Sequence, residues 1–236
     1  AVVIAASRYI AEDALADIAV EWEPLPVAAD LERAARADAP RVHDDVPGNV
    51  SAQVRQTKGH YAAAVKQAAV VIRRRFAYDH GCSSPIETRG IVAQWDDKAD
   101  RMTVWDTTQA PVFLRNGLAA ILGLSERQVR VIAPFIGGGF GPKIMLFYPE
   151  EVVVPWASLR LGRPVKWIED RAEHFVATTH ERGQIHDAEI ALDAEGRIIG
   201  VKDVLCRSKN TVHSEVPGRP RVLHDPPAVA IAIGSA

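Results

Sequence analysis

Residues 136–143 read Ile-Gly-Gly-Gly-Phe-Gly-Pro-Lys and are the part of the chain best suited to bind a ligand. Because glycine lacks a Cβ atom, its backbone N–H can approach a ligand closely and its φ can be positive. Successive N–H groups presented in this way form a concave site for phosphate or oxo groups. The same pattern also fits an ordinary tight turn between two elements, so its meaning depends on its surroundings.

A second motif, Thr107-Thr108-Gln109, lies earlier in the chain and again where a strand pattern changes into a helix pattern. The amide of Gln109 is a neutral hydrogen-bond donor, which can steady an oxo group without changing its charge. The alternative is a glutamine in a surface turn. Two such turns in one chain favour a shared site over two unrelated turns.

These motifs, in this order, resemble the molybdopterin-binding large subunits of the xanthine dehydrogenase, aldehyde oxidase and carbon monoxide dehydrogenase family. The resemblance implies hydroxylation of a small-molecule substrate, namely an aldehyde, an N-heterocycle, a CoA thioester or CO, with water as the oxygen source. It covers roughly residues 1–205, and the matching segments are 107–111, 117–119, 122–124, 129–131, 137–141, 148–151, 162–167 and 169–171.

The resemblance also implies roles for individual residues. The side chain of Gln109 would hydrogen-bond an oxygen ligand of molybdenum, and the backbone N–H of Phe140 would approach the apical oxo ligand. Gly138, Gly139 and Gly141 would leave room for the pterin and for the turn. Alanine at Gly139 is expected to clash, or to be strained if φ is positive there. No protein side chain is expected to bind the metal, since the pterin dithiolene holds it in this family.

The expected cofactor is molybdopterin with molybdenum, as the cytosine dinucleotide in a bacterial enzyme. The expected partners are an FAD-binding medium subunit and a 2Fe–2S small subunit. The family's catalytic glutamate belongs to a second cofactor domain beyond this chain, as does the copper-binding cysteine loop of the carbon monoxide dehydrogenases. The chain alone is therefore not expected to be active, and a separate chain carrying the second molybdopterin domain would be a further partner.

Two other functions remain open from the residues. One is a catalytically inactive structural or interaction module that lacks the second cofactor domain. The other is a nucleotide-binding dehydrogenase domain, but Pro142 stands where the fingerprint Gly-x-Gly-x-x-Gly needs its last glycine. That fingerprint also requires an acidic residue about 20 positions further on, which the chain does not supply.

Several charged residues near the motifs have competing interpretations. Lys143 and Arg115 could meet cofactor phosphates, but solvated surface charges are commoner. Glu87 and Arg89 are interpreted as a structural ion pair or turn anchor. Glu150-Glu151 suggests a general base, yet adjacent helical residues do not face one another, so a role at the helix N-terminus is favoured. The four histidines at positions 80, 174, 180 and 186 lack zinc-type spacing.

The composition limits the class of protein. The 236 residues are 47% hydrophobic and 25% charged with a formal charge of −2, which gives no reason to expect nucleic acid or a membrane surface as partner. Neither a membrane-spanning run nor a signal peptide is visible. Cys82 and Cys206 fit a reduced, cytoplasmic protein and are too few to hold an iron–sulfur cluster alone.

Hydrophobic periodicity and cap residues predict the elements that position these motifs. The predicted class is α+β, with the C-terminal part of an α/β hammerhead domain (1–37), a linker (38–50), an incomplete first molybdopterin-binding domain (51–216) and an atypical tail (217–236). The tail is interpreted as a truncated or frameshifted end. Strands are expected at 1–6, 18–22, 70–76, 89–95, 101–107, 129–132, 164–168, 184–192 and 198–205, and helices at 8–16 after the N-cap Ser7, 30–37, 60–68, 113–122 and 150–161, the last two closed by Gly123 and Gly162.

Overall fold

The computed structural model describes residues 2–45, 48–50, 52–144, 147–207 and 229–232, which form a mixed α/β structure. These residues pack into two units. The first unit comprises residues 2–21, 82–179 and 229–232, and the second comprises residues 22–81 and 180–207. Among the described helices, none is both long and apolar enough to cross a bilayer.

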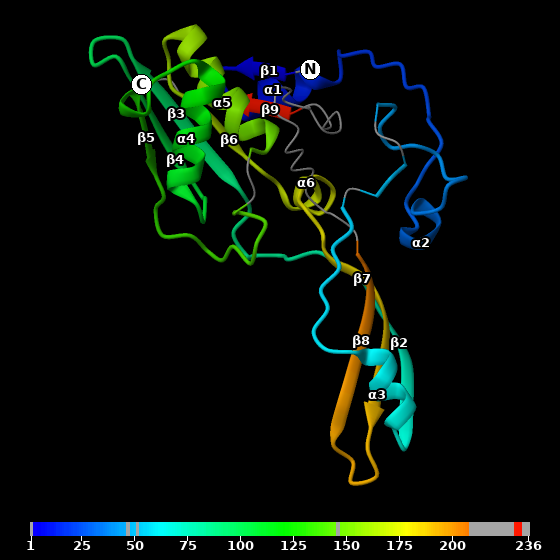
Figure 1. Cartoon of the computed structure of the whole chain (residues 1–236). Coiled ribbons are helices and arrows are strands. Elements are labelled where there is room, and N and C mark those ends of the chain that lie inside the picture. The colour runs from blue at the N-terminus through cyan, green and yellow to red at the C-terminus, as the bar shows by residue number, and fades with distance from the viewer. Residues whose placement is uncertain (1, 46–47, 51, 145–146, 208–228, 233–236) are drawn as a thin grey trace. The chain divides into compact units, whose positions relative to one another are not determined.

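The first unit contains a six-stranded sheet in the order β1-β9-β6-β3-β4-β5 (Figure 1). β3 pairs antiparallel with both β4 and β6, whereas β5 runs parallel to β4 and β9 runs parallel to β1. The parallel β4–β5 pair places the segments 107–109 and 136–143 after the same ends of neighbouring strands. The strands are β1 (Val2–Ala5), β3 (Gly90–Asp96), β4 (Arg101–Asp106), β5 (Val129–Ile132), β6 (Val165–Ile168) and β9 (Val229–Ala232).

Two helices cover this sheet and close its core. α4 (Pro111–Leu122) and α5 (Pro149–Leu161) each begin with a proline, and they end at the left-handed glycines Gly123 and Gly162, as the sequence predicted. α1 (Arg8–Leu15), η1 (Glu126–Gln128) and α6 (Arg171–Ala177) complete the unit. The core lies between sheet and helices and consists of Ile91, Ala93, Met102, Val104, Leu114, Leu118, Ala119, Val129, Val154, Ala157, Val165 and Trp167.

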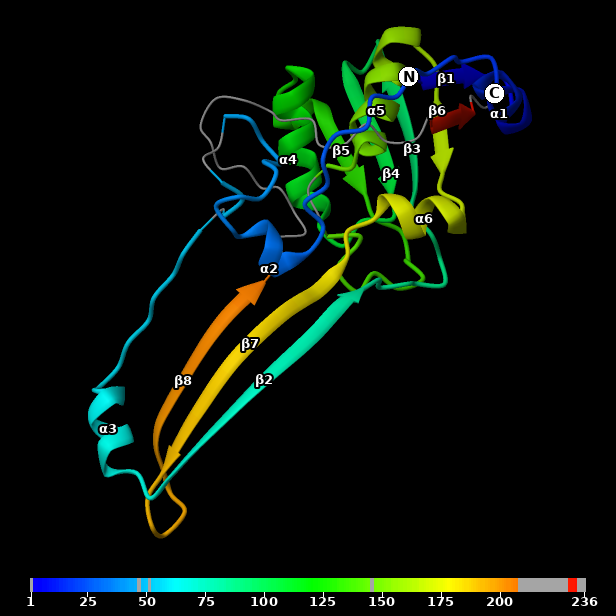
Figure 2. The same cartoon turned by 90° about the vertical axis from the view of Figure 1, so that its right-hand side faces the viewer.

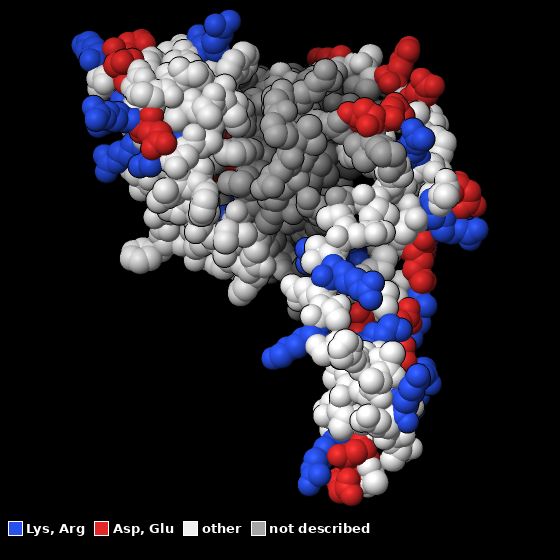
Figure 3. Space-filling view, in the orientation of Figure 1, with Lys and Arg blue, Asp and Glu red and all other residues white. Residues whose placement is uncertain are grey.

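The second unit is a three-stranded antiparallel sheet in the order β2-β7-β8 (Figure 2). Its strands are β2 (Val70–Gly81), β7 (Glu181–Leu192) and β8 (Ile198–Arg207), and its helices are α2 (Leu31–Ala34) and α3 (Tyr61–Gln67). α3 packs closely on β8 at Gly200, where a Cβ atom would lie 2.9 Å from that of Ala64. Figure 3 shows side chains of both charge signs mixed along this unit.

Several predicted elements differ from the structure. Residues 18–22 form no strand, because no strand among the described residues pairs with them. Val20 and Trp22 are exposed there. The helix predicted at 30–37 is limited to α2, and β2 continues beyond residue 76 because it pairs with β7 as far as Gly81. The helix α6 was not predicted. Most of the tail 217–236 lies outside the described residues, and the predicted domain ranges stay a prediction.

Candidate functional site

The turn that carries Gln109 is fixed through its main chain. The backbone N–H of Gln109 donates to the carbonyl of Lys143 at 2.8 Å, and the hydroxyl of Thr108 donates to the same carbonyl at 3.3 Å. The Thr108 hydroxyl oxygen also accepts from the N–H of Ala110 at 3.0 Å, immediately before α4 begins. The turn is therefore held at both ends, and the exposed side chain of Gln109 projects from it.

The glycine-rich loop between β5 and α5 has an unusual backbone. Gly138 and Gly141 have φ values of 93° and 104°, and Phe140 between them has φ 52°. Glycine adopts such angles freely, but a bulky residue there stores of the order of 1–3 kcal/mol of strain, a feature that clusters at ligand sites. The ring of Phe140 is exposed and lies over Gly138, which has no Cβ to oppose it.

The two loops meet at the Gln109 side chain. A Cβ atom on Gly139 would lie only 2.3 Å from Cδ and Oε1 of Gln109, so the absence of a side chain there makes room for the amide. The φ of Gly139 is not positive, and the reason for glycine is therefore steric. The backbone N–H of Gly141 donates to Oε1 of Gln109 at 3.2 Å.

That single hydrogen bond determines which way the Gln109 amide faces. A backbone N–H can be satisfied only by an acceptor, so the oxygen must face Gly141 and the NH₂ group must face away from it. No hydrogen bond to this NH₂ group occurs among the described residues. The site therefore presents one oriented, neutral donor on a side chain that lies against Gly139.

Bulky apolar side chains around the loops are exposed to solvent. Ile86 is 97% exposed and Phe135 is fully exposed, although Ile86 adjoins Glu87, which contacts the glycine loop. Exposed apolar surface of this kind is available for contact with a ligand or a partner. The exposed set is Ile86, Val112, Phe113, Phe135 and Phe140.

Glu87 holds the first residue of the glycine loop and is not paired with Arg89. Its Oε2 accepts from the backbone N–H of Gly137 at 2.7 Å and from Nζ of Lys143 at 2.8 Å. Its own N–H donates to the carbonyl of Gly137 at 3.3 Å. Burial opposes ionisation of this carboxyl, but the hydrogen bonds from Lys143 and Gly137 outweigh burial and hold the pKa of Glu87 below its usual range. The interpretation as a turn anchor is confirmed, and the pairing with Arg89 was wrong.

Arg89 instead sits at the centre of a buried ion network. Its Nε and Nη2 donate to Oε1 of Glu169 at 2.9 and 2.6 Å, and its Nη1 lies 3.3 Å from Oε2 of Glu150. The guanidinium stacks on the ring of Tyr148, 3.7 Å from the ring centre. Burial would raise the pKa of Glu169, but the hydrogen bonds and charge of Arg89 lower it. This network joins the start of β3 to β6 and α5.

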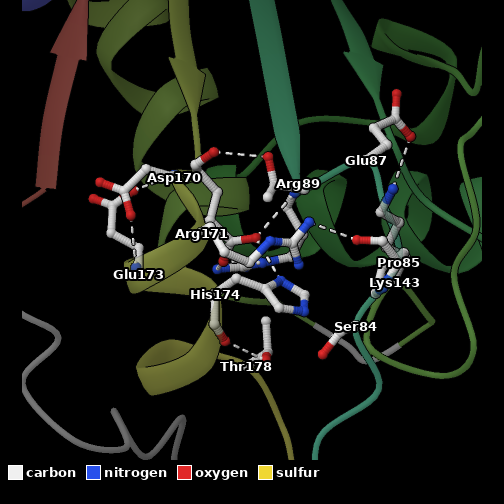
Figure 4. Close-up of polar contacts among 12 residues, drawn as sticks. Ser84, Pro85, Glu87, Arg89, Lys143, Asp170, Arg171, Glu173, His174 and Thr178 are labelled. Atoms are coloured by element: carbon white, nitrogen blue, oxygen red, sulfur yellow. Dashed lines mark hydrogen bonds and ion pairs between the residues drawn. The ribbon is translucent and has the colours of Figure 1, made fainter.

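Residues of α6 hold the segment 82–89 on the side opposite Glu87 and Lys143 (Figure 4). Nη2 of Arg171 donates to the carbonyls of Pro85 and Ile86 at 2.6 and 2.8 Å. The fully buried ring of His174 lies 3.0 Å from the carbonyl of Ser83 through Nε2, and its Nδ1 faces Glu169. Sequence reasoning missed this helix, although its signal was present: Asp170 and Glu173 form a capping box.

The carboxyls of Asp106 and Glu151 are buried beside a cavity of about 10 Å³, roughly the space of one water molecule. Lys143 and Arg89 also line this cavity. Burial raises the pKa of Asp106 to about 7, against the opposing charges of Arg89 and Lys143. Burial and the neighbouring Asp106 raise that of Glu151 to about 8. The inward position of Asp106 was readable from the strand alternation Met102, Val104, Asp106.

The remaining predicted residues have structural partners. Lys143 is 2% exposed and points to Glu87, so neither a surface position nor a free phosphate-binding ammonium describes it. Arg115 lies 2.9 Å from Glu126. Glu151 accepts from the N–H of Tyr148 at 3.0 Å as a helix cap, which agrees with the predicted N-terminal role. No group of His, Cys, Asp and Glu side chains suited to a metal ion occurs among the described residues.

The family model described as "Molybdopterin cofactor-binding domain" matches residues 42–210. The gamma subunit of the 6-hydroxypseudooxynicotine dehydrogenase complex of Paenarthrobacter nicotinovorans is 40% identical over 201 residues, which cover 85% of this chain and 25% of that protein. The carbon monoxide dehydrogenase large chain of Hydrogenophaga pseudoflava is 36% identical over 215 residues, which cover 86% and 27%.

A solved structure is also similar to this chain in both sequence and fold. Quinoline 2-oxidoreductase from Pseudomonas putida 86 superimposes with a TM-score of 0.78 at 38% identity, over 84% of this chain and 25% of that one. The chain thus spans about a quarter of the length of the proteins it matches. The matched range 42–210 contains both loops described above.

Proposed function

The chain belongs to the molybdopterin cofactor-binding domain family, and we propose that it forms part of the large subunit of a molybdenum hydroxylase. The reaction would oxidise an aldehyde, an N-heterocycle, a CoA thioester or CO with water as the oxygen source. The observation that carries this proposal is the convergence of the two loops on Gln109, whose outward NH₂ group is held in place by Gly141. When bound, the molybdenum cofactor supplies the two-electron redox chemistry of the hydroxylation.

The residues present suit such a cofactor in three respects. Gly139 has no Cβ atom to displace the Gln109 side chain, so the amide can lie directly against the glycine loop. The amide of Gln109 is a preorganised neutral donor, which stabilises developing negative charge without reorganisation during the reaction. The positive φ of Phe140 turns the loop so that its exposed ring lies over Gly138.

The chain's own residues would bind and orient the cofactor. Gln109 would donate from Nε2, the N–H of Phe140 would be a second donor, and Gly138, Gly139 and Gly141 would line the pterin. The apolar side chains around the loops would exclude water from the bound cofactor. The base that accepts the proton would come from a part of the protein beyond these residues.

Several finer assignments belong to the same proposal. The cofactor would be molybdopterin cytosine dinucleotide, and electrons would pass to 2Fe–2S and FAD groups on a small and a medium subunit. Residues 1–37 would belong to a hammerhead domain, and residues 51–216 to the first molybdopterin-binding domain. The cysteines Cys82 and Cys206 are both free, which suits a cytoplasmic location.

The test is the metal content and turnover of the full-length subunit purified with its partners. Wild type should contain stoichiometric molybdenum by elemental analysis and should oxidise a member of the substrate classes above, with quinoline and nicotine as first probes. Gln109→Ala should keep the fold but lower kcat by about 10²–10³-fold, the loss typical of one preorganised donor. A wild-type subunit without molybdenum would overturn the proposal in favour of an inactive module.

One further variant, with a control, separates donation by the Gln109 amide from acceptance by it. Gln109→Glu retains an acceptor for the N–H of Gly141 but has no NH₂ donor, so turnover should fall as it does in Gln109→Ala. Gln94→Ala is the matched control, because Gln94 is exposed on β3 in the same unit. If Gln109→Glu keeps full turnover, donation from the amide is not required.

A further inference from the structure

Lys143 is linked to both loops of the candidate site, although it is not itself a residue of that site. Its Nζ binds Glu87, whose same carboxylate oxygen holds the N–H of Gly137 at the start of the glycine loop. Its carbonyl accepts from the N–H of Gln109 and from the hydroxyl of Thr108. One residue thus connects the segment 82–89, the glycine loop and the Gln109 turn.

We propose that Glu87 and Lys143 are positioning residues that set the distance between the Gln109 amide and the glycine loop. We call this pair the Glu87–Lys143 clamp. Neither residue contacts the cofactor; they act through the backbone of Gly137 and the main chain of the Gln109 turn. The inference rests on the proposed function for its catalytic meaning, but the geometry can be tested independently.

The Glu87–Lys143 clamp is fixed to the surrounding structure on both sides. The Lys143 side chain is 1% exposed, so loss of Glu87 would leave a buried ammonium without its partner. Glu87 belongs to the segment 82–89, which α6 holds through the hydrogen bonds from Arg171 to the carbonyls of Pro85 and Ile86. Figure 4 shows Glu87 and Lys143 on one side of this segment and the α6 residues on the other.

A clamp also explains two features that a simple surface loop would not need. A Cβ on Gly137 would lie 2.6 Å from Cβ of Glu87, so the loop backbone is pressed against the clamp residue itself. The ammonium of Lys143 is almost completely buried. Burial of a charged group costs free energy, so a structural or functional role for this residue is expected. Holding the Gln109 amide within a fraction of an ångström of its position for catalysis is such a role.

Amide hydrogen exchange of the purified full-length subunit tests the clamp directly. The reporters are the N–H groups of Gln109, Gly137 and Gly141, each of which donates to a bond described above. Lys143→Met and Glu87→Gln should each speed exchange of the Gln109 and Gly141 amides by about tenfold, as expected for loss of one anchoring interaction. The double variant should be no faster than either single variant, because both changes remove the same ion pair.

Glu126→Gln is the matched control, since Glu126 pairs with Arg115 at the surface and should leave these amides unchanged. Unchanged exchange in both clamp variants would overturn the inference. Faster exchange spread equally over β3 and β4 would also overturn it, because that pattern reports lost core stability rather than loop position. Glu87 is partly exposed, so Glu87→Gln remains informative if Lys143→Met does not fold.

A second readout uses the assembled holoenzyme. Lys143→Met should retain molybdenum, lower kcat more than it raises KM, and alter the Mo(V) electron paramagnetic resonance signal produced with dithionite. Unaltered kcat and signal would refute the positioning role. Absence of molybdenum in wild type would refute the proposed function alone, because the exchange measurement does not depend on the metal.

Discussion

The backbone N–H of Gly141 donates to the side-chain oxygen of Gln109 at 3.2 Å, and this contact joins two loops that follow neighbouring parallel strands. It has two consequences. The amide nitrogen of Gln109 is turned outward as a donor, and the side chain occupies the space that Gly139 leaves open.

Gly139→Ala should displace Gln109 while keeping the fold. The new methyl group would collide with the end of the Gln109 side chain, which is flexible and exposed, and φ at this position suits alanine. We expect the melting temperature to stay close to that of wild type and turnover to fall as far as in Gln109→Ala. A variant with full turnover would show that Gln109 does not need this space. The double variant with Gln109→Ala should add no further loss.

Arg89→Met should lower the free energy of unfolding by about 3–5 kcal/mol, because Glu169 and Glu150 would lose their buried cation. Urea denaturation followed by circular dichroism measures this change. Arg115→Met is the control: Arg115 pairs with Glu126 at the surface, and its removal should cost about 1 kcal/mol or less. Equal losses in the two variants would contradict the assigned role of the buried network.

The stability of the chain should fall as the pH rises from about 5 to about 8. Asp106 and Glu151 have pKa values raised to about 7 and about 8, against about 4 in the unfolded chain. In this window the folded state keeps protons that the unfolded state has lost, so a rise in pH favours unfolding. Because the two carboxyls interact, the slope belongs to the pair and not to either residue alone.

Glu151→Gln should flatten this pH dependence, and it keeps the oxygen that accepts from Tyr148 in the helix cap. Asp106→Asn should have the same effect from the other side of the pair. Glu195→Gln, in the exposed turn between β7 and β8, should leave the slope unchanged. Chemical denaturation at several pH values gives the slope for each variant, and a wild-type curve that rises through this window would contradict the assignment.

Gly117→Ala should destabilise the packing of α4 against the chain that follows the glycine loop. A Cβ on Gly117 would lie 1.7 Å from Cζ of Phe147, whose backbone is already held at φ 58° and cannot easily retreat. Overpacking of this kind costs about 1–3 kcal/mol. Urea denaturation should detect the loss, whereas Asn116→Ala, at an exposed position of the same helix, should not destabilise the chain. Equal stability of wild type and Gly117→Ala would show that Phe147 can move.

Local signals were sufficient for most elements of this protein. Ser7 caps α1, Gly123 and Gly162 close α4 and α5, and the alternation in residues 101–106 places Met102 and Val104 in the core. Each of these depends on interactions within a few residues, which the order of side chains specifies directly. The segment 18–22 shows the limit, because its strand-like pattern has no pairing partner in the described part of the chain, and pairing depends on residues far away in the sequence.

The two motifs and their order were enough to identify the family, since both lie in contiguous stretches of chain. What the charged side chains do was decided only by the tertiary structure. Lys143 pairs with Glu87 rather than with a phosphate or with water, Arg89 binds Glu169 rather than Glu87, and Asp106 and Glu151 share one buried cavity. The charge state of such groups follows from burial and from neighbours brought together by folding, and neither is encoded in local sequence.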